Sequence, residues 1–111
     1  MRVNDLIQEG CFKLLNGGED LNREITSPYC CDLLSVAMGR LPAGAAWVTV
    51  MGNVNTLAVA ALTDASCIIL AEGSLLDEAA LRKAEEQGVT VFQTEAPVFT
   101  SALTIHKLLN A

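Results

Sequence analysis

The chain has 111 residues, of which 51 % are hydrophobic and 18 % charged, and its formal net charge is −6. This length is typical of one domain, and we expect a single domain over residues 1–111. Its seven Lys and Arg residues form no basic cluster, so we expect no binding of nucleic acid and no attraction to anionic membrane surfaces.

The apolar fraction is slightly above that of ordinary globular domains. Because a small domain keeps much of its surface exposed, we expect part of this excess to be covered by a second copy in a homodimer. The N-terminal ten residues carry Asp5 and Glu9 where a targeting signal would be apolar, and Asp64 interrupts the longest apolar run, 57–71. We therefore expect a cytoplasmic protein with no membrane span.

The four cysteines, Cys11, Cys30, Cys31 and Cys67, contain no C-x-x-C pair, and His106 is the sole histidine. Zinc sites need closely spaced Cys or His ligands, so we expect no metal and no cofactor. In a reducing compartment we expect free thiols that act as small buried hydrophobes rather than as redox groups. If the two adjacent cysteines lie in an extended segment, they point to opposite faces and at most one is buried.

The first half of the chain predicts short elements. In chain order they are a helix over 3–9, a strand over 11–15, a turn over 16–18, an extended segment over 24–30 and a helix over 31–38. The first helix has apolar residues at helical spacing and a natural stop at Gly10. Pro28 favours an edge position or a bulge for the extended segment, because proline cannot donate to a sheet.

The second half is more regular. It predicts strands over 47–51, 67–70 and 89–92, alternating with helices over 56–62 and 77–87 and a last helix from Pro97. Asp77 and Glu78 suit a helix start, and Gly88 suits a helix end. Alternation of this kind predicts an α/β fold, with a mainly parallel sheet, flanking helices and right-handed crossovers.

In open parallel sheets, ligands bind beyond the carboxyl ends of the strands. Three loops would form that edge here, at 52–56, 72–74 and 93–96. Gly52, Asn53 and Asn55 would meet free helix N–H groups, a combination that suits an anion or a polar ligand. In the alternative, which we favour, the two asparagines only cap and turn. Gly73 and Thr94 are the candidate residues of the other two loops.

The segment 21–29 mixes charge, β-branched residues and proline. It predicts either an edge strand before a capped helix, or a ligand or partner loop around Arg23, Thr26 and Asp32. No P-loop, G-x-G-x-x-G or G-x-S-x-G motif occurs, and His106 would lie far from the strand ends. We therefore expect no enzyme. Catalysis at Arg23, Thr26 and Asp32 is the least favoured alternative.

Two stretches carry a family resemblance: Leu-Asn-Arg-Glu-Ile-Thr at 21–26 and Asp-Leu-Leu-Ser-Val-Ala-Met at 32–38. Together with Trp-Val-Thr-Val at 47–50, Ile-Ile-Leu at 68–70 and Ala-Glu-Glu-Gln-Gly-Val at 84–89, they resemble the DRTGG domain family over nearly the whole chain. Where that family has two glycines after the threonine, this chain has Ser27-Pro28. Proline fixes φ and removes a donor, so the loop is not chemically equivalent.

The resemblance implies a fold similar to the N-terminal domain of HPr kinase/phosphorylase, and to that of Mur ligases. It implies a non-catalytic regulatory or small-ligand-binding module of bacterial type, commonly dimeric. A nucleotide or a phosphorylated metabolite is the ligand we expect. The alternative is an accessory protein-interaction subunit of a larger kinase, phosphotransacetylase or redox enzyme complex.

Overall fold

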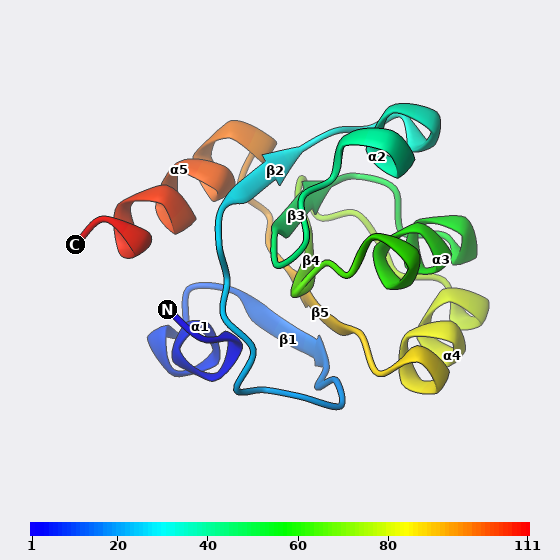
Figure 1. Ribbon diagram of the computed structural model, residues 1–111, viewed down its shortest axis with the longest axis horizontal. Helices are drawn as coiled ribbons and strands as arrows, with labels where there is room; N and C mark the ends of the chain where they lie inside the picture. Colours follow the sequence, from blue (N-terminus) through cyan, green and yellow to red (C-terminus); the bar gives the residue numbers. More distant parts are fainter.

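The computed structural model describes all residues 1–111 and consists of one five-stranded sheet between two layers of helices (Figure 1). In chain order the elements are α1 (Val3–Glu9), β1 (Lys13–Asn16), β2 (Pro28–Cys30), α2 (Leu34–Arg40), β3 (Ala46–Thr49), α3 (Val54–Thr63), β4 (Cys67–Leu70), α4 (Glu78–Gln87), β5 (Thr90–Gln93) and α5 (Val98–Leu109). None of these helices is long and apolar enough to span a bilayer.

The strand order is β1-β5-β4-β3-β2. The strands β2 to β5 are parallel to their neighbours, and β1 pairs antiparallel with β5. The predicted α/β class with a mainly parallel sheet is therefore confirmed. Pro28 opens β2, which is an edge strand, as expected from its missing donor. The sheet takes up less of the extended segment than predicted, because only residues 28–30 pair with β3.

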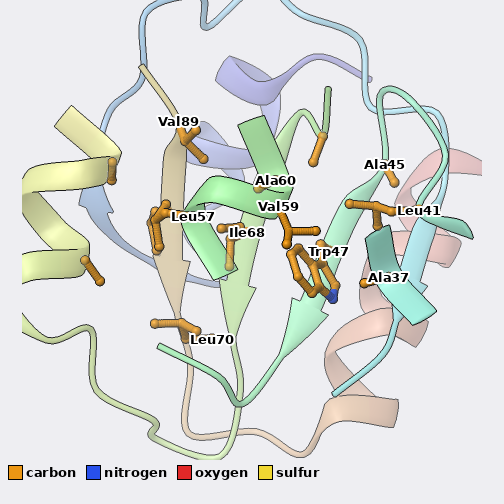
Figure 2. Packing of buried hydrophobic residues seen from close by; sticks show 14 residues of the cluster. Ala37, Leu41, Ala45, Trp47, Leu57, Val59, Ala60, Ile68, Leu70 and Val89 are labelled. Carbon is orange, nitrogen blue, oxygen red and sulfur yellow. The ribbon is translucent and has the colours of Figure 1, made fainter. Parts of the chain in front are cut away.

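One face of the sheet packs against α2, α3 and α4 (Figure 2). Trp47, Ile68 and Leu70 project from the strands to this face and are fully buried beneath Leu57 and Ala60 of α3. The Trp47 indole N–H, which needs a partner when buried, donates to the Cys31 carbonyl oxygen at 2.9 Å. This bond ties the segment after β2 to the middle of the core.

The opposite face packs against α1 and α5, which both lie on the other side of the sheet (Figure 1). Val48, Ile69 and Phe92 alternate with the residues of the first face, as the period of a strand requires. Burial on both faces explains why the central strands read as continuous apolar runs.

The thiols follow the expectation of small buried hydrophobes only in part, since neither Cys30 nor Cys31 is fully buried. Cys67 starts β4 and is fully buried, but Cys11 and Cys30 are exposed and Cys31 is partly exposed. The difference follows from position, because Cys67 lies in a central strand. Cys11 lies in the loop before β1, Cys30 ends the edge strand β2, and Cys31 follows it.

Candidate functional site

The predicted site residues divide between the two edges of the sheet. Six of them follow the carboxyl ends of the strands: Asp32, Gly52, Asn53, Asn55, Gly73 and Thr94. Arg23 and Thr26 precede β2 and lie at the amino edge. The loop expected around Arg23, Thr26 and Asp32 is therefore not one site. An extended chain rises about 3.3 Å per residue, so β2 and its flanks carry Asp32 about 20 Å from Thr26.

Asp32 is engaged by the neighbouring strand. Its Oδ1 accepts hydrogen bonds from the Thr49 hydroxyl at 2.6 Å and from the Val50 N–H at 2.9 Å. The Thr49 hydroxyl oxygen in turn accepts from the Met51 N–H at 3.3 Å. Thr49 is fully buried, so this carboxylate satisfies a buried hydroxyl and fixes the chain where it leaves β3.

Loops at the carboxyl edge pack against one another. A Cβ at Gly52 would overlap the Leu75 carbonyl oxygen, and the Asp77 N–H donates to the Gly52 carbonyl at 3.1 Å. Gly73 has φ +68, and its N–H donates to the Thr94 carbonyl at 2.9 Å. The expected pocket is not present at this edge, since none of the three hollows of the structure is lined by residues of these loops.

Asn53 adopts the capping role that we favoured. Its side-chain oxygen accepts from the backbone N–H groups of Asn55 at 3.0 Å and Thr56 at 3.1 Å. These N–H groups open α3, so Asn53 uses the donors that an anion would need. Asn55 is exposed in the first turn of the same helix.

At the amino edge, Arg23 binds the end of α3. Its Nη2 donates to the carbonyl oxygen of Asp64 at 3.0 Å and forms an ion pair with the Asp64 carboxylate at 3.0 Å. Asp64 ends α3 in the left-handed conformation, with φ 62. The guanidinium therefore stabilises both a helix-terminal carbonyl and a strained non-glycine cap.

Thr26 holds the turn before β3. Its hydroxyl donates to the Ala43 carbonyl at 3.1 Å, and its N–H donates to the Gly44 carbonyl at 2.9 Å. Next along the chain, the Ser27 carbonyl accepts from the Ala46 N–H at 2.8 Å. Ser27-Pro28, the departure from the family pattern, thus leads directly into β2.

A partly open hollow of about 390 Å³ lies at this amino edge. It is lined by residues from the segment before β2, the end of α3 and the α4–β5 turn: Glu19, Asp20, Arg23, Ala60, Ala61, Asp64, Ala65, Ser66, Gln87, Gly88, Val89 and Thr90. Arg23 is the one predicted site residue in this lining. The volume of the hollow lies within the range of small-molecule sites, roughly 300–1,000 Å³.

The position of the hollow follows from two close backbone approaches. Gly18 donates its N–H to the Thr90 hydroxyl at 2.9 Å, and Glu19 donates to the Gly88 carbonyl at 3.0 Å. A Cβ at Gly18 would lie 2.8 Å from the Thr90 nitrogen, so the approach requires glycine. The Asn-Gly-Gly turn was the only signal in the sequence that this segment lies close to another backbone.

The charge of the hollow is acidic. Glu19, Asp20 and Asp64 supply carboxylates against the single guanidinium of Arg23. Glu85 and Glu86 line an adjoining hollow of about 370 Å³ that shares Glu19 with the first. The negative electrostatic potential of these carboxylates disfavours a ligand that offers only a phosphate group for binding.

Three of the four thiols have a raised pKa. Burial raises the pKa of Cys11 and of Cys30, and the charge of Asp32 raises the pKa of Cys30 further. Burial raises the pKa of Cys67 to about 12. A raised pKa keeps a thiol protonated and weakly nucleophilic. His106 is exposed near the end of α5 and lines none of the hollows.

Residues 11–108 match the DRTGG domain, and no curated protein matches the chain. A similar solved structure contains the CBS and DRTGG domains of the regulatory region of Clostridium perfringens pyrophosphatase, complexed with the activator diadenosine tetraphosphate. The TM-score is 0.73 at 12 % identity, over 92 % of this chain and 44 % of that chain.

This likeness concerns the fold, and the chain spans less than half the length of that regulatory region. The match at 11–108, in contrast, covers most of the sequence and includes both stretches that carried the resemblance. The chain belongs to the DRTGG domain family.

Proposed function

We propose that this chain is a regulatory module without catalytic activity of its own. The observation that carries the proposal is its membership of a domain family whose fold also occurs in the regulatory region of a pyrophosphatase. The separation of Arg23 and Thr26 from Asp32 supports it, because the alternative enzyme site required these three residues to meet.

We propose the amino-edge hollow, rather than the carboxyl edge, as the place where a small ligand binds. Among the expected ligand classes a nucleotide fits better than a small phosphorylated metabolite. A nucleotide has a neutral base and ribose that can occupy an acidic hollow, and Arg23 supplies one cation for a phosphate. The similar pyrophosphatase region is complexed with a dinucleotide, which supports the same class.

Thermal unfolding tests this ligand. A compound present at about 100 times its dissociation constant adds about 2.7 kcal/mol of stability. For a domain of this size that corresponds to an increase in Tm of about 10 °C or more. Diadenosine tetraphosphate, adenosine monophosphate, adenosine and a sugar phosphate should be compared on the native chain. An increase confined to the adenine compounds is the expected result.

Two variants locate the site. Arg23→Gln should reduce the shift caused by the nucleotides, whereas Arg82→Gln, an exposed arginine of α4, should leave it unchanged. No shift with any adenine compound, or an equal shift in both variants, would contradict ligand binding at this hollow.

We also propose that the module is a homodimer. More than half of the residues are hydrophobic, and large apolar side chains remain exposed on several elements, including Leu14, Met38 and Leu62. Light scattering at micromolar concentration should give twice the chain mass of 11.8 kDa. A mass of one chain at all concentrations would contradict the dimer.

A second candidate function is that of an accessory subunit that binds another protein. It is favoured by the exposure of Leu75 and Phe99, which are 79 % and 74 % exposed. Single exposed hydrophobics are ordinary, but large ones gathered in one place mark interaction sites.

A further inference from the structure

Three of the four most exposed large hydrophobic residues follow strands at the carboxyl edge of the sheet; the fourth, Leu62, lies near the end of α3. Leu75, Phe99 and Leu33 are 79 %, 74 % and 58 % exposed, and each follows the carboxyl end of a parallel strand. Val50 and Val54, 37 % and 39 % exposed, follow β3 in the same way. We call these five residues, with Asp32, Glu72 and Glu95 between them, the carboxyl-edge surface.

Hydrogen bonds between loops make this surface continuous. The bond from the Val50 N–H to Asp32 places Leu33 beside the end of β3. Close contact between Gly52 and the Leu75 carbonyl brings the loop after β4 against the loop after β3.

The start of α5 completes the surface. The Glu72 N–H donates to the Ala96 carbonyl at 2.9 Å, which joins the loop of Leu75 to the segment that opens α5. That segment carries Phe99, and α5 begins beside the end of β2 (Figure 1). The apolar side chains therefore lie along one rim of the molecule.

Carboxylates outnumber cations on this rim; beside it lies one exposed lysine, Lys13 of β1, which is paired with Gln93 at the end of β5. Asp32, Glu72 and Glu95 are exposed and take part in none of the ion pairs of the structure. The nearest arginine of α4, Arg82, is paired with Glu78. A second copy of the chain would bring three carboxylates per copy together here against a single lysine, whereas a cationic partner would meet both the apolar and the charged groups.

We propose that the carboxyl-edge surface docks a cationic, amphipathic segment of a partner protein. The rim from β2 to β5 spans three strand spacings, about 14 Å, which matches a helix of about three turns. Such a segment places its apolar side chains on Leu33, Leu75 and Phe99 and its Lys or Arg groups on the carboxylates. This inference rests on the accessory-subunit function proposed above.

The probe is a fluorescent three-turn peptide of Leu and Lys, with Leu on one helical face. Its matched control replaces every Lys by Glu. Fluorescence anisotropy should show binding of the Lys peptide, weakened by salt, and no binding of the Glu peptide. No binding of the Lys peptide, or equal binding of both peptides, would overturn the proposal.

Variants separate this surface from general attraction to an acidic protein. Leu75→Ser with Phe99→Ser, and Glu72→Lys with Glu95→Lys, should each weaken binding by about tenfold or more. Two control variants should leave peptide binding unchanged. They are Leu62→Ser, at an equally exposed position of α3, and Glu85→Lys with Glu86→Lys on α4. Equal losses in both sets overturn the proposal. All of these side chains are exposed, so melting curves should confirm folding.

Light scattering on the same variants keeps the two proposals apart. If the dimer persists while peptide binding is lost, the docking surface stands. If Leu75→Ser with Phe99→Ser dissociates the dimer, the occupant is a second copy and the docking proposal fails. A monomeric native chain that still binds the peptide would contradict only the dimer.

Discussion

The Asp32 carboxylate and the Thr49 hydroxyl are joined by a hydrogen bond of 2.6 Å across the ends of β2 and β3. Thr49 is fully buried, and a buried hydroxyl without a partner is costly. Asp32 is therefore a structural residue of the carboxyl edge, and its contribution can be measured.

We predict that Asp32→Ala destabilises the fold by about 2 kcal/mol, because it leaves both the Thr49 hydroxyl and the Val50 N–H without their acceptor. Thr49→Val removes the hydroxyl and retains the shape. The double variant should lose less stability than the sum of the two single losses, and the difference, the coupling free energy, should be about 1 kcal/mol or more. Urea unfolding of the four proteins measures this cycle, and additive costs would contradict the linkage.

The tight packing of the carboxyl-edge loops can be tested at Gly52, with Gly39 of α2 as the control. Gly52→Ala should destabilise the protein by about 2 kcal/mol or more, because the new Cβ would overlap the Leu75 carbonyl and separate the loops. Gly39→Ala, in α2 with nothing within 4 Å, should stabilise it by about 0.5–1 kcal/mol. Thermal unfolding compares the two, and equal effects would contradict tight loop packing.

At the amino edge, Arg23→Ala should cost about 1–2 kcal/mol, mainly through the lost bond to the Asp64 carbonyl. The Asp64 carboxylate is largely exposed, so the ion pair itself contributes little to stability. The difference in stability between the native chain and Arg23→Ala should therefore change little at high salt. Arg82→Ala, which removes an exposed pair within α4, should change stability by about 0.5 kcal/mol or less. A larger loss for Arg82→Ala than for Arg23→Ala would contradict this reading.

The central strands were predictable because a strand that is buried on both faces appears in the sequence as a continuous run of apolar residues. β4 was predicted with its observed bounds, and α4 was placed correctly from Asp77, which caps it, and Gly88, which ends it. β1 and β2 were harder to define, because each is short and lies at an edge. Their ends depend on pairing with β5 and β3, which a local pattern does not contain.

The candidate site was less predictable. The hollow is formed by residues around 19–23, 60–66 and 87–90, three segments that meet only in the folded chain. Asp32 was expected in one loop with Arg23 and Thr26, but it lies beside the strand ends, and the sequence does not reveal that its carboxylate binds the Thr49 hydroxyl. Asn53 followed the commoner role of capping, as favoured from the sequence.

Cys67 gives a prediction for the pH dependence of stability. Burial raises the pKa of its thiol from 9.0 to about 12 in the folded chain. The folded state therefore keeps this proton when the unfolded state has lost it, so stability is unaffected below about pH 9 and falls between pH 9 and 12. The fall attributable to Cys67 is up to about 1.4 kcal/mol per pH unit.

The comparison of native chain and Cys67→Ala isolates this effect, since tyrosine and lysine also titrate at alkaline pH. The variant should be less stable at pH 7, because a small cavity is created in the core, by about 1 kcal/mol. Its stability should then fall less steeply above pH 9 than that of the native chain. Urea midpoints at several pH values measure both slopes, and parallel slopes would show that the Cys67 thiol ionises as readily in the folded chain as in the unfolded one.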